Sequence, residues 1–451
     1  MSNGGTFQFD KDSLALLRQA LERMEQGFAS LPAFDPPHVD ETSIRKVLLE
    51  VAERMHDNYP YFHPLYAGQM LKPPHPVARL AYALALWINP NNHALDGGRA
   101  SSQMEKEAVA EIAGMYGWDA HLGHLTGGGT MANLEALWIA GQLEPDGVIL
   151  ASDQAHYTHG RISGVLKLPF ESVGCDRYGR MEPTALEERL REGGVGTVVA
   201  TLGTTATGSV DPLPEILELR ERYGFRLHAD CAYGGYHTLA SNLAPPARAA
   251  FDRLGLADSI VIDPHKHGLQ PYGCGCVLFR DPGVGKFYKH DSPYTYFSSS
   301  ELHLGEISLE CSRPGAAAVA LWATQRLFPL KRGGEFARML SDCRTAALQL
   351  YDDLTMDERF VPAFTPELDI VVWAVKARTV AASSSAARDY FAEAAKRGLH
   401  LALAELPASW FSPASGSQGS STTLTCLRSV AMKSSHAEWM TEIRSIAGIG
   451  P

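Results

Sequence analysis

Hydrophobic residues recur at helical spacing near the start of the chain. One helix face carries Leu14, Leu17, Leu21 and Met24. A proline-rich stretch, SLPAFDPPHVD, separates this run from a second helical run, IRKVLLEVAERMHDNY. Two amphipathic helices of this size do not bury their apolar faces alone. The pattern therefore predicts an N-terminal arm or segment over residues 1–95 that lies either on the main body or on a second subunit.

Farther along the chain, predicted helices alternate with short apolar runs. The runs that we expect to form strands are GVILAS (147–152), TVVATLG (197–203), RLHAD (226–230), SIVID (259–263) and CGCVLF (274–279). Continuous apolar strands separated by helices indicate a mainly parallel sheet covered on both faces, which makes the chain an α/β protein. Ligands of such sheets bind at the carboxyl ends of the strands.

Two local patterns complete the predicted organisation. Ser102 and Glu105 predict a capping box at the start of the helix SQMEKEAVAEIAGMYG. Toward the end of the chain, PELDIVVWAV predicts a strand and SSAARDYFAEAAKRG a helix. We therefore expect a large domain over residues 96–330 and a small C-terminal α+β domain over residues 331–451.

Composition narrows the class of partner. The 451 residues are 45% hydrophobic and 20% charged, with a net charge of -11, which argues against a nucleic-acid partner held through its phosphates. The seven scattered cysteines predict reduced thiols in a cytoplasmic protein. No apolar stretch has the length of a membrane span and no signal-peptide pattern is found, so a small-molecule partner is expected.

Unusual polar residues follow the predicted strands, and the first group is a glycine turn. LTGGGTMANLEALWIAG places Gly128, Gly129 and Thr130 at the start of a helix. Bare backbone amides at a helix N-terminus suit a phosphate, although a glycine triplet is more often a tight turn. The pattern is neither GxGxxG nor GxxxxGK[ST], which disfavours dinucleotide and nucleotide binding of those kinds.

The second and third groups follow the next two strands. His156 stands in ASDQAHYTHGR, where a purely structural histidine is the alternative interpretation. TLGTTATGSVDP ends a strand in small hydroxyl residues, and Thr204 and Thr205 are placed to approach a bound ring. A plain Gly-Thr turn is the alternative for this third group.

The fourth and fifth groups carry a carboxylate and an amine. Asp230 follows an apolar strand beside the small Ala232, and a buried carboxylate needs a partner such as a pyridinium N–H. A helix-capping aspartate is the alternative. Lys266 lies between His265 and His267 among apolar strands, which fits poorly with a surface loop. A desolvated amine in a cationic place is suited to form imines with carbonyl compounds.

Together the five groups have the composition of a site for pyridoxal phosphate (PLP). The strings DPHKHG, HADCAYGG and SDQAHYTH resemble the group II PLP-dependent amino acid decarboxylases, over roughly residues 60–330. The resemblance implies the fold-type I, aspartate aminotransferase-like architecture. It also implies a homodimer whose active sites lie between the subunits, and decarboxylation of an L-amino acid to an amine and CO2.

The resemblance also implies a role for each candidate residue. Lys266 would carry PLP as a Schiff base, Asp230 would face the pyridine nitrogen, and Thr205 the phenolic oxygen. His156 and Ala232 would lie on the two ring faces, and His265 beside the lysine. The phosphate would meet Gly128, Gly129, Thr130 and Asp263. A tyrosine on a loop after the lysine protonates the substrate carbanion in this family, which makes Tyr294 and Tyr296 the candidates here.

Substrate choice is expected to depend on an N-terminal strip. In YPYFHPLYAGQM, the residues Phe62, His63 and Tyr66 predict an aromatic wall. In NPNNHALDGG, Asn92 and His93 suit a polar or acidic side chain equally well. We favour an aromatic substrate of the tyrosine or tryptophan type, with an acidic amino acid as the alternative.

Other classes remain as alternatives. Arg313 in SRPGAAA would serve a carbon–carbon lyase that acts on a phosphorylated amine. An aminotransferase is less favoured, because it needs an arginine for the substrate carboxylate. His121 and His124 share an HxxH spacing, but at a turn without a helix this is a poor metal site, and no metal is expected. A catalytically silent scaffold of the same fold is the non-enzyme alternative.

Overall fold

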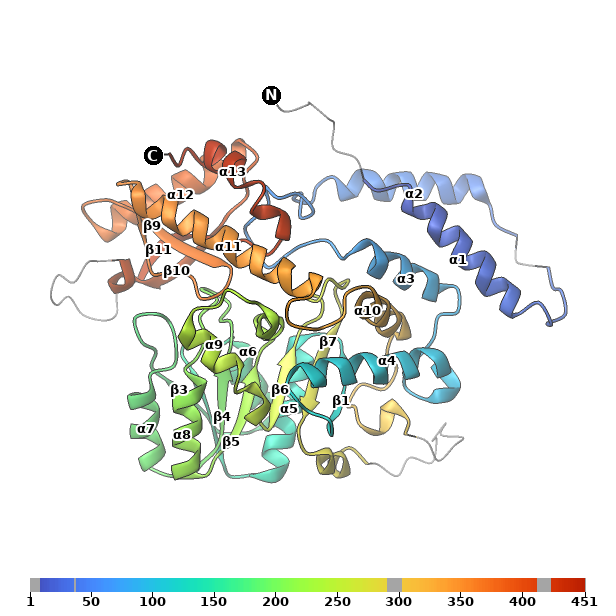
Figure 1. Ribbon diagram of the computed structural model, residues 1–451, viewed down its shortest axis with the longest axis horizontal. Coiled ribbons are helices and arrows are strands. Elements are labelled where there is room, and N and C mark those ends of the chain that lie inside the picture. The colour runs from blue at the N-terminus through green and yellow to red at the C-terminus, as the bar shows by residue number, and fades with distance from the viewer. Residues whose placement is uncertain (1–8, 36–37, 290–301, 412–422, 451) are drawn as a thin grey trace.

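The computed structural model describes residues 9–35, 38–289, 302–411 and 423–450, and it contains two sheets (Figure 1). The large sheet and its helices are built from α3 (Pro76–Leu86), α4 (Leu95–Met115), β1 (Leu122–Thr126), α5 (Gly129–Leu143), β2 (Val148–Ser152), α6 (Thr158–Leu166), β3 (Phe170–Val173), α7 (Pro183–Arg191), β4 (Val195–Thr201), α8 (Leu213–Tyr223), β5 (Arg226–Asp230), α9 (Pro245–Phe251), β6 (Ser259–Ile262), β7 (Gly275–Phe279) and α10 (Gly315–Leu327).

The large sheet has seven strands in the order β1-β7-β6-β5-β4-β2-β3. The neighbours from β3 through β6 pair in parallel, whereas β7 pairs antiparallel with both β6 and β1. The predicted mainly parallel sheet is therefore confirmed. The sequence did not predict β1 and β3, because LGHLT is interrupted by Gly and His and FESV is short and partly exposed.

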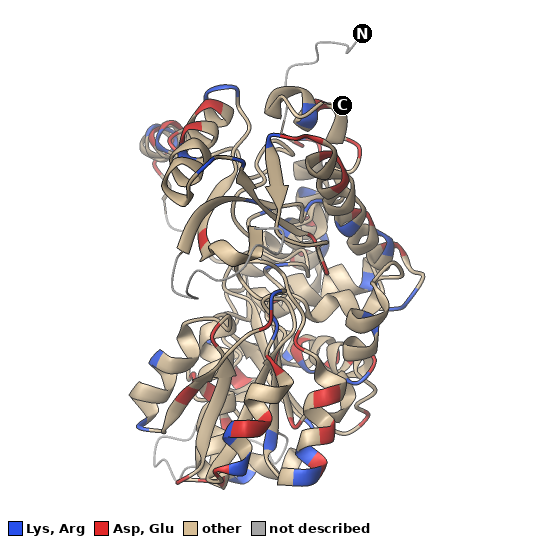
Figure 2. Ribbon diagram, turned by 90° about the vertical axis from the view of Figure 1, so that its left-hand side faces the viewer, with Lys and Arg blue, Asp and Glu red and all other residues tan. Residues whose placement is uncertain are grey.

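Helices cover the large sheet on both faces, and charged residues are more frequent on those helices than on the strands (Figure 2). Strands β5, β6 and β7 are almost wholly buried. A charged side chain on one of these strands would need a buried partner to offset its desolvation. This burial explains why the strands read as continuous apolar runs.

The capping box predicted at Ser102 and Glu105 is wrong. Helix α4 begins at Leu95, so both residues lie inside the helix and are buried. The Glu105 carboxylate accepts hydrogen bonds from the Leu125 backbone N–H (3.0 Å) and from the Arg313 guanidinium (2.9 Å). Glu105 therefore joins α4 to β1 and to the segment before α10.

The second sheet has four antiparallel strands in the order β10-β11-β9-β8. Its elements are α11 (Glu335–Met356), β8 (Phe360–Pro362), β9 (Ile370–Val375), α12 (Val380–Lys396), β10 (Ala402–Pro407), β11 (Thr423–Val430) and α13 (Met440–Ala447). The strand and the helix predicted in this region are found as β9 and α12. The domain boundaries near residues 95 and 330 stay a prediction.

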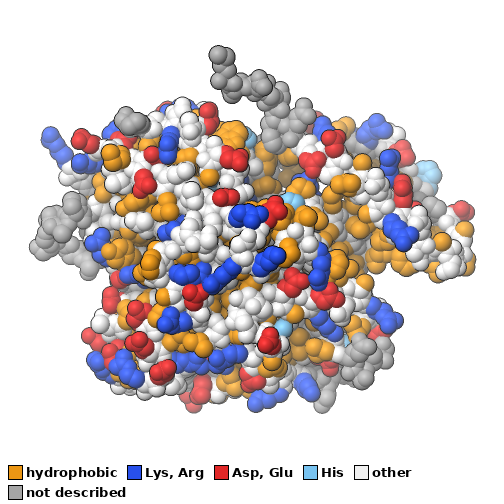
Figure 3. All heavy atoms as spheres, viewed as in Figure 1, with side chains coloured by type: hydrophobic (Ala, Val, Ile, Leu, Met, Phe, Trp, Pro, Cys, Tyr) orange, Lys and Arg blue, Asp and Glu red, His pale blue; other side chains and the backbone are white. Residues whose placement is uncertain are grey.

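The N-terminal arm consists of α1 (Ser13–Gly27) and α2 (Glu41–Met55), as the periodicity predicts. Helix α1 packs against α3, whereas α2 buries none of its residues. Five exposed apolar residues of α2 form one stripe, namely Ile44, Val47, Leu48, Val51 and Met55, whereas the exposed Leu49 lies off it. Figure 3 shows hydrophobic side chains on this projecting arm. Among the described residues, no helix has the length and apolar character needed to cross a membrane.

Glu105→Ala tests the role of the buried carboxylate. We expect the free energy of unfolding to fall by about 3–5 kcal/mol, because the buried Arg313 charge loses its partner. Glu107→Ala on the same helix is the matched control, since its partner Arg326 is half exposed, and it should lose at most about 1 kcal/mol. Urea denaturation measures both values, and equal losses in the two variants would contradict this role for Glu105.

Candidate active site

A cavity of about 550 Å³ lies at the carboxyl ends of the parallel strands. Loops after five strands of the large sheet open onto it. The cavity brings together all ten residues that the sequence nominated for a cofactor, namely Gly128, Gly129, Thr130, His156, Thr205, Asp230, Ala232, Asp263, His265 and Lys266. Residues that are far apart along the chain, such as Gly128 and Lys266, thus line the same cavity.

The glycine turn between β1 and α5 is closely packed. Gly128 has a φ of 148°, and a Cβ on it would lie 3.3 Å from the His265 ring. A Cβ on Gly129 would lie 2.7 Å from the Asp263 carboxylate. Glycine is therefore needed at both positions. Because Gly129 begins the 15-residue α5, the first free amides of that helix lie at the cavity.

Asp230 ends β5 and is buried. Its Oδ2 atom lies 2.8 Å from His159 Nε2, and its Oδ1 atom accepts the Ala232 N–H at 3.1 Å. Burial alone would raise the pKa of Asp230, but the hydrogen bond and the electrostatic attraction of His159 reverse this and lower that pKa below its usual range. Asp230 is therefore held as a carboxylate.

Sequence reasoning missed His159. It lies on α6 three residues after His156, is completely buried, and points its imidazole at Asp230 rather than at the cavity. The available signal was the repeated histidine in HYTHG, directly after a predicted strand. His156 itself lines the cavity, and its Nδ1 atom lies 2.8 Å from the Thr158 hydroxyl. Burial lowers the pKa of His156, which favours a neutral ring.

The Lys266 amine lies 3.1 Å from Asp263 Oδ2, and about a fifth of the side chain, 22%, is exposed to the cavity side. His265 is fixed next to it: its Nδ1 atom lies 2.8 Å from the Cys274 carbonyl, and its ring meets Tyr272 at 4.7 Å. Burial lowers the pKa of His265 despite the nearby Asp263 carboxylate. The lysine is thus flanked by one carboxylate and a largely neutral imidazole.

The two threonines after β4 have different environments. Thr204 is buried, and its hydroxyl lies 2.8 Å from that of Thr207 within the turn. Thr205 is exposed and lines the cavity. Only Thr205 is therefore available to a ligand. Glu310 also lines the cavity, and its carboxylate accepts the Gly127 N–H at 3.0 Å. No sequence pattern had indicated this residue.

The five predicted substrate residues do not line this cavity within one chain. Phe62 lines a different cavity, the His63 ring meets Trp439 at 4.8 Å, and the Tyr66 ring meets Tyr61 at 4.9 Å. The prediction of a substrate wall from these aromatic residues is therefore not met in the single chain.

Asn92 and His93 do not line the cavity either. The Asn92 amide is fully buried and donates to Glu105 at 2.6 Å, so its hydrogen-bonding capacity is used in the fold. The backbone carbonyl of His93 accepts the Gly305 N–H at 2.8 Å. Tyr294 and Tyr296, the candidates for the proton donor, lie outside the described residues.

Two residues behind the alternative interpretations are structural. Arg313 is buried and paired with Glu105, and it does not line the cavity, so the lyase alternative loses the arginine on which it depended. His124 lies on strand β1 rather than at a turn, and its Nε2 atom lies 3.0 Å from the buried Glu135. The expected environment of the HxxH pair was therefore wrong.

Solved structures share this fold across nearly the whole chain. Apo mouse CSAD superposes with a TM-score of 0.76, covering 97% of this chain and 99% of that one at 19% identity. TDC from Oryza sativa, solved with PLP and tryptamine, gives 0.76, covering 98% and 99% at 17% identity. At these identities the likeness establishes the fold alone, and it is that of the fold-type I PLP-dependent decarboxylases, as expected.

The sequence model of the pyridoxal-dependent decarboxylase conserved domain matches residues 138–376, more than half of the 451 residues. The chain therefore belongs to the pyridoxal-dependent decarboxylase family, whose cofactor is pyridoxal 5′-phosphate. Both the resemblance and the cofactor inferred from the sequence are confirmed.

The names of the curated relatives indicate two kinds of substrate, an aromatic and an acidic amino acid. The L-tyrosine decarboxylase of Enterococcus faecium is 28% identical over 64% of this chain, and the aspartate 1-decarboxylase of Aliivibrio fischeri is 28% identical over 69%. The chain covers 64% and 63% of these two relatives, a little under two thirds of their length. The L-aspartate decarboxylase of Thermococcus kodakarensis is 30% identical over 62% of this chain.

His159→Leu tests the support that His159 gives to Asp230. The variant leaves a buried carboxylate without its charged hydrogen bond, so the pKa of Asp230 should rise. A hydrogen bond to a charged group is worth about 1.5–3 kcal/mol, which predicts a roughly 10- to 150-fold weaker affinity for pyridoxal phosphate. Spectrophotometric titration of the apoprotein measures this. His121→Leu, away from the cavity, is the control, and unchanged affinity in His159→Leu would exclude the role.

Proposed function

We propose that this chain catalyses the PLP-dependent decarboxylation of an L-amino acid, and that the substrate is aromatic. The observation that supports this most is the single cavity shared by the Lys266 amine, the Asp230 carboxylate and the Gly128–Thr130 turn. These are an imine-forming group, an anionic partner for a ring nitrogen and an anion-binding turn. Family membership makes pyridoxal phosphate the ligand to which this set should be compared.

The residues present suit pyridoxal phosphate. The free amides at the start of α5, with the Thr130 hydroxyl, are suited to its phosphate. We propose that Lys266 binds the cofactor aldehyde through its amine, that Thr205 meets the phenolic oxygen, and that His156 and Ala232 enclose the ring. Asp263 lies against Gly129 and adds negative charge there, so we assign it to the Lys266 amine, its partner at 3.1 Å, rather than directly to the phosphate.

Bound pyridoxal phosphate supplies an electron-poor ring that accepts the negative charge left when a carboxyl group departs as CO2. Asp230 would hold a proton on the ring nitrogen, because its own pKa is low and its position is fixed by His159. Asp263 and His265 would orient the Lys266 side chain. Asp230 and Asp263 are themselves buried, so water screens their charges little, which strengthens their electrostatic contacts.

An aromatic substrate is supported by the remaining lining of the cavity. Met131, Leu134, Tyr233 and Tyr272 line it, and among the described lining residues Lys266 is the single Lys or Arg side chain. A substrate with a second carboxylate would be expected to meet a guanidinium there. The tyrosine decarboxylases among the relatives agree with this choice. An acidic amino acid is the second candidate, because other relatives are aspartate decarboxylases.

The function is tested by cofactor chemistry and product analysis together. The wild type should be yellow, should lose its visible absorbance on borohydride reduction, and should then carry the adduct on Lys266. It should release equal amounts of CO2 and amine, with L-tyrosine or L-tryptophan preferred over L-aspartate and L-glutamate. Lys266→Ala should retain the fold and lose turnover, whereas Lys376→Ala, an exposed lysine, should keep it.

Each part of this proposal has its own contradicting result. A colourless protein that is unaffected by added pyridoxal phosphate would favour the silent scaffold. Amine release without CO2 would exclude decarboxylation. Faster turnover of L-aspartate than of L-tyrosine would reject the aromatic substrate while leaving the reaction intact, and near-normal rates in Lys266→Ala would remove the lysine from the mechanism.

We further propose that the chain acts as a cytoplasmic homodimer, with a second copy covering the apolar stripe of α2. A stripe of five exposed apolar residues on one helix is large for a monomer surface. Val47→Glu with Leu48→Glu should convert the dimer to a monomer in size-exclusion chromatography with light scattering. Lys46→Glu, on the opposite face of α2, should leave the dimer intact. A monomeric wild type, or a dimeric double variant, would contradict this interface.

A further inference from the structure

A second cavity, of about 370 Å³, lies on the other side of the loop that carries Lys266. The two cavities share no lining residue: His265 and Lys266 face the first, whereas His267 and Leu269 line the second. The walls of the second cavity come from four parts of the chain, namely the segment before α3, the Lys266 loop, α11 and the segment after β11. Its size is within the range of small-molecule sites.

Among the described residues, two lysines and no carboxylate line this second cavity. The Lys433 amine donates to the Tyr66 carbonyl at 2.6 Å and lies 5.3 Å from the centre of the Tyr66 ring. The Lys72 amine donates to the carbonyls of His267 and Met432, both at 3.4 Å. Within the described part of the chain, neither amine forms an ion pair. Carbonyls and a ring face offset part of the cost of burying an ammonium group, but they supply no negative charge.

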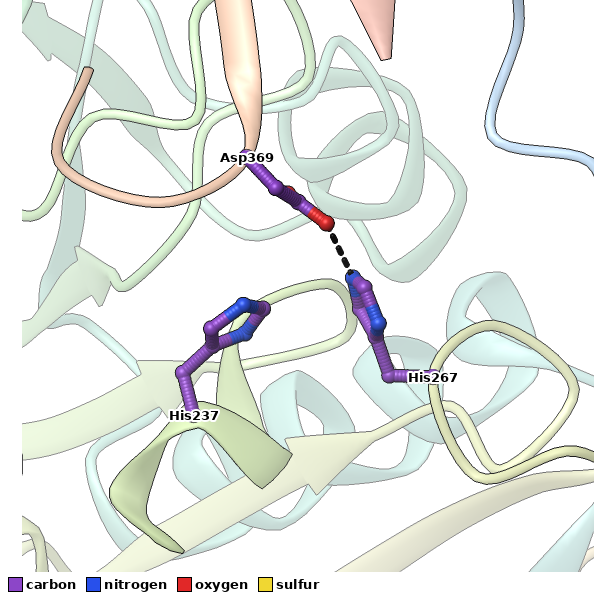
Figure 4. A group of neighbouring side chains, drawn as sticks. All are labelled: His237, His267 and Asp369. Atoms are coloured by element: carbon purple, nitrogen blue, oxygen red, sulfur yellow. Dashed lines mark ion pairs between the residues drawn. The ribbon is translucent and has the colours of Figure 1, made fainter. Parts of the chain in front are cut away.

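The nearby carboxylate of Asp369 already has partners for both of its oxygen atoms. Its Oδ1 atom accepts the Tyr233 hydroxyl at 2.6 Å, and its Oδ2 atom lies 3.2 Å from His267 Nε2. Figure 4 shows this ion pair, with the His237 ring turned toward the same space. Two histidines and a carboxylate are donor types that suit a metal ion. The Lys72 ammonium group lies next to His267 and repels a metal cation. The positive charges of Lys72 and Lys433 therefore favour an anion in the second cavity.

Both lysines of the second cavity have lowered pKa values. Burial, together with the positive charge of Lys72, lowers the pKa of Lys433 to about 7. Burial also lowers the pKa of Lys72. The Asp369 carboxylate opposes the shift of Lys72, but the direct partners of both amines are carbonyl oxygens. An anion placed between them would supply a compensating charge and would form hydrogen bonds with two charged donors.

We propose that the second cavity binds a small organic anion, with its carboxylate or phosphate group held by Lys72 and Lys433. The rest of the cavity wall is largely apolar and includes Phe62, Pro73, Leu269, Phe336, Leu340 and Met432. The ligand therefore combines one anionic group with an apolar or aromatic body. This site is separate from the proposed active site and does not depend on the substrate assigned there.

Calorimetric titration of the cofactor-loaded protein tests the proposal, because bound cofactor fills the phosphate-binding turn of the first cavity. The probes are benzoate and phenyl phosphate, with benzamide as the neutral analogue. We expect saturable binding of at least one anion and none of benzamide. Lys433→Gln and Lys72→Gln should each weaken binding at least about tenfold, through loss of a charge-assisted hydrogen bond. Glutamine at 433 keeps a donor for the Tyr66 carbonyl.

Two further variants make the outcome decisive. Lys433→Arg keeps the positive charge and should retain binding, and Lys376→Gln removes an exposed lysine elsewhere and should bind as the wild type does. The difference between benzoate and phenyl phosphate reports whether the site takes a carboxylate or a phosphate. Absence of saturable binding of both anions, equal binding of benzamide, or unchanged affinity in both glutamine variants would overturn the proposal.

Discussion

The parallel pairing of β2, β4, β5 and β6 is the constraint on which the site depends. Parallel strands end at one edge of a sheet, so the residues that follow them meet whatever their separation along the chain. The register places Thr201 opposite Asp230, and Asp230 opposite Val261, two residues before Asp263. The pairing of the strand backbones therefore places the Asp230 carboxylate close to the Lys266 loop, independently of side-chain contacts.

Buried charges around this edge are paired one by one. Asp230 is held by His159, Asp263 by Lys266, and Asp369 by His267. The first and third pairs join different segments, whereas Asp263 and Lys266 belong to the same loop. Removing one partner of such a pair would leave a buried charge without compensation. The second sheet reaches the same region through Arg428 on β11, which donates to the Thr205 carbonyl at 2.7 Å and to the Gly68 carbonyl at 3.0 Å. The turn with Thr205 is thus fastened to the N-terminal segment.

Local sequence was sufficient for the features that depend on neighbouring residues. The apolar strands and the glycine turn could be predicted because each is encoded within a few positions, and Lys266 could be singled out for the same reason. The capping box failed because Ser102 and Glu105 match a helix start locally, whereas Glu105 is committed to Arg313, 208 positions away. His159 and the positions of Phe62 and Asn92 also depend on contacts across the fold, which no spacing pattern records.

The Lys266 loop links the two cavities, and its backbone explains how. His265 and Lys266 line the first cavity, whereas the next residue, His267, lines the second. Leu269 then adopts a φ of 64°, a conformation that costs a non-glycine residue energy and persists only when its surroundings hold it. The Leu269 carbonyl accepts the His75 N–H at 3.0 Å, which supplies such a restraint from the wall of the second cavity. The position of Lys266 is therefore set from both sides, by the carboxylate in front of it and by the packing behind it.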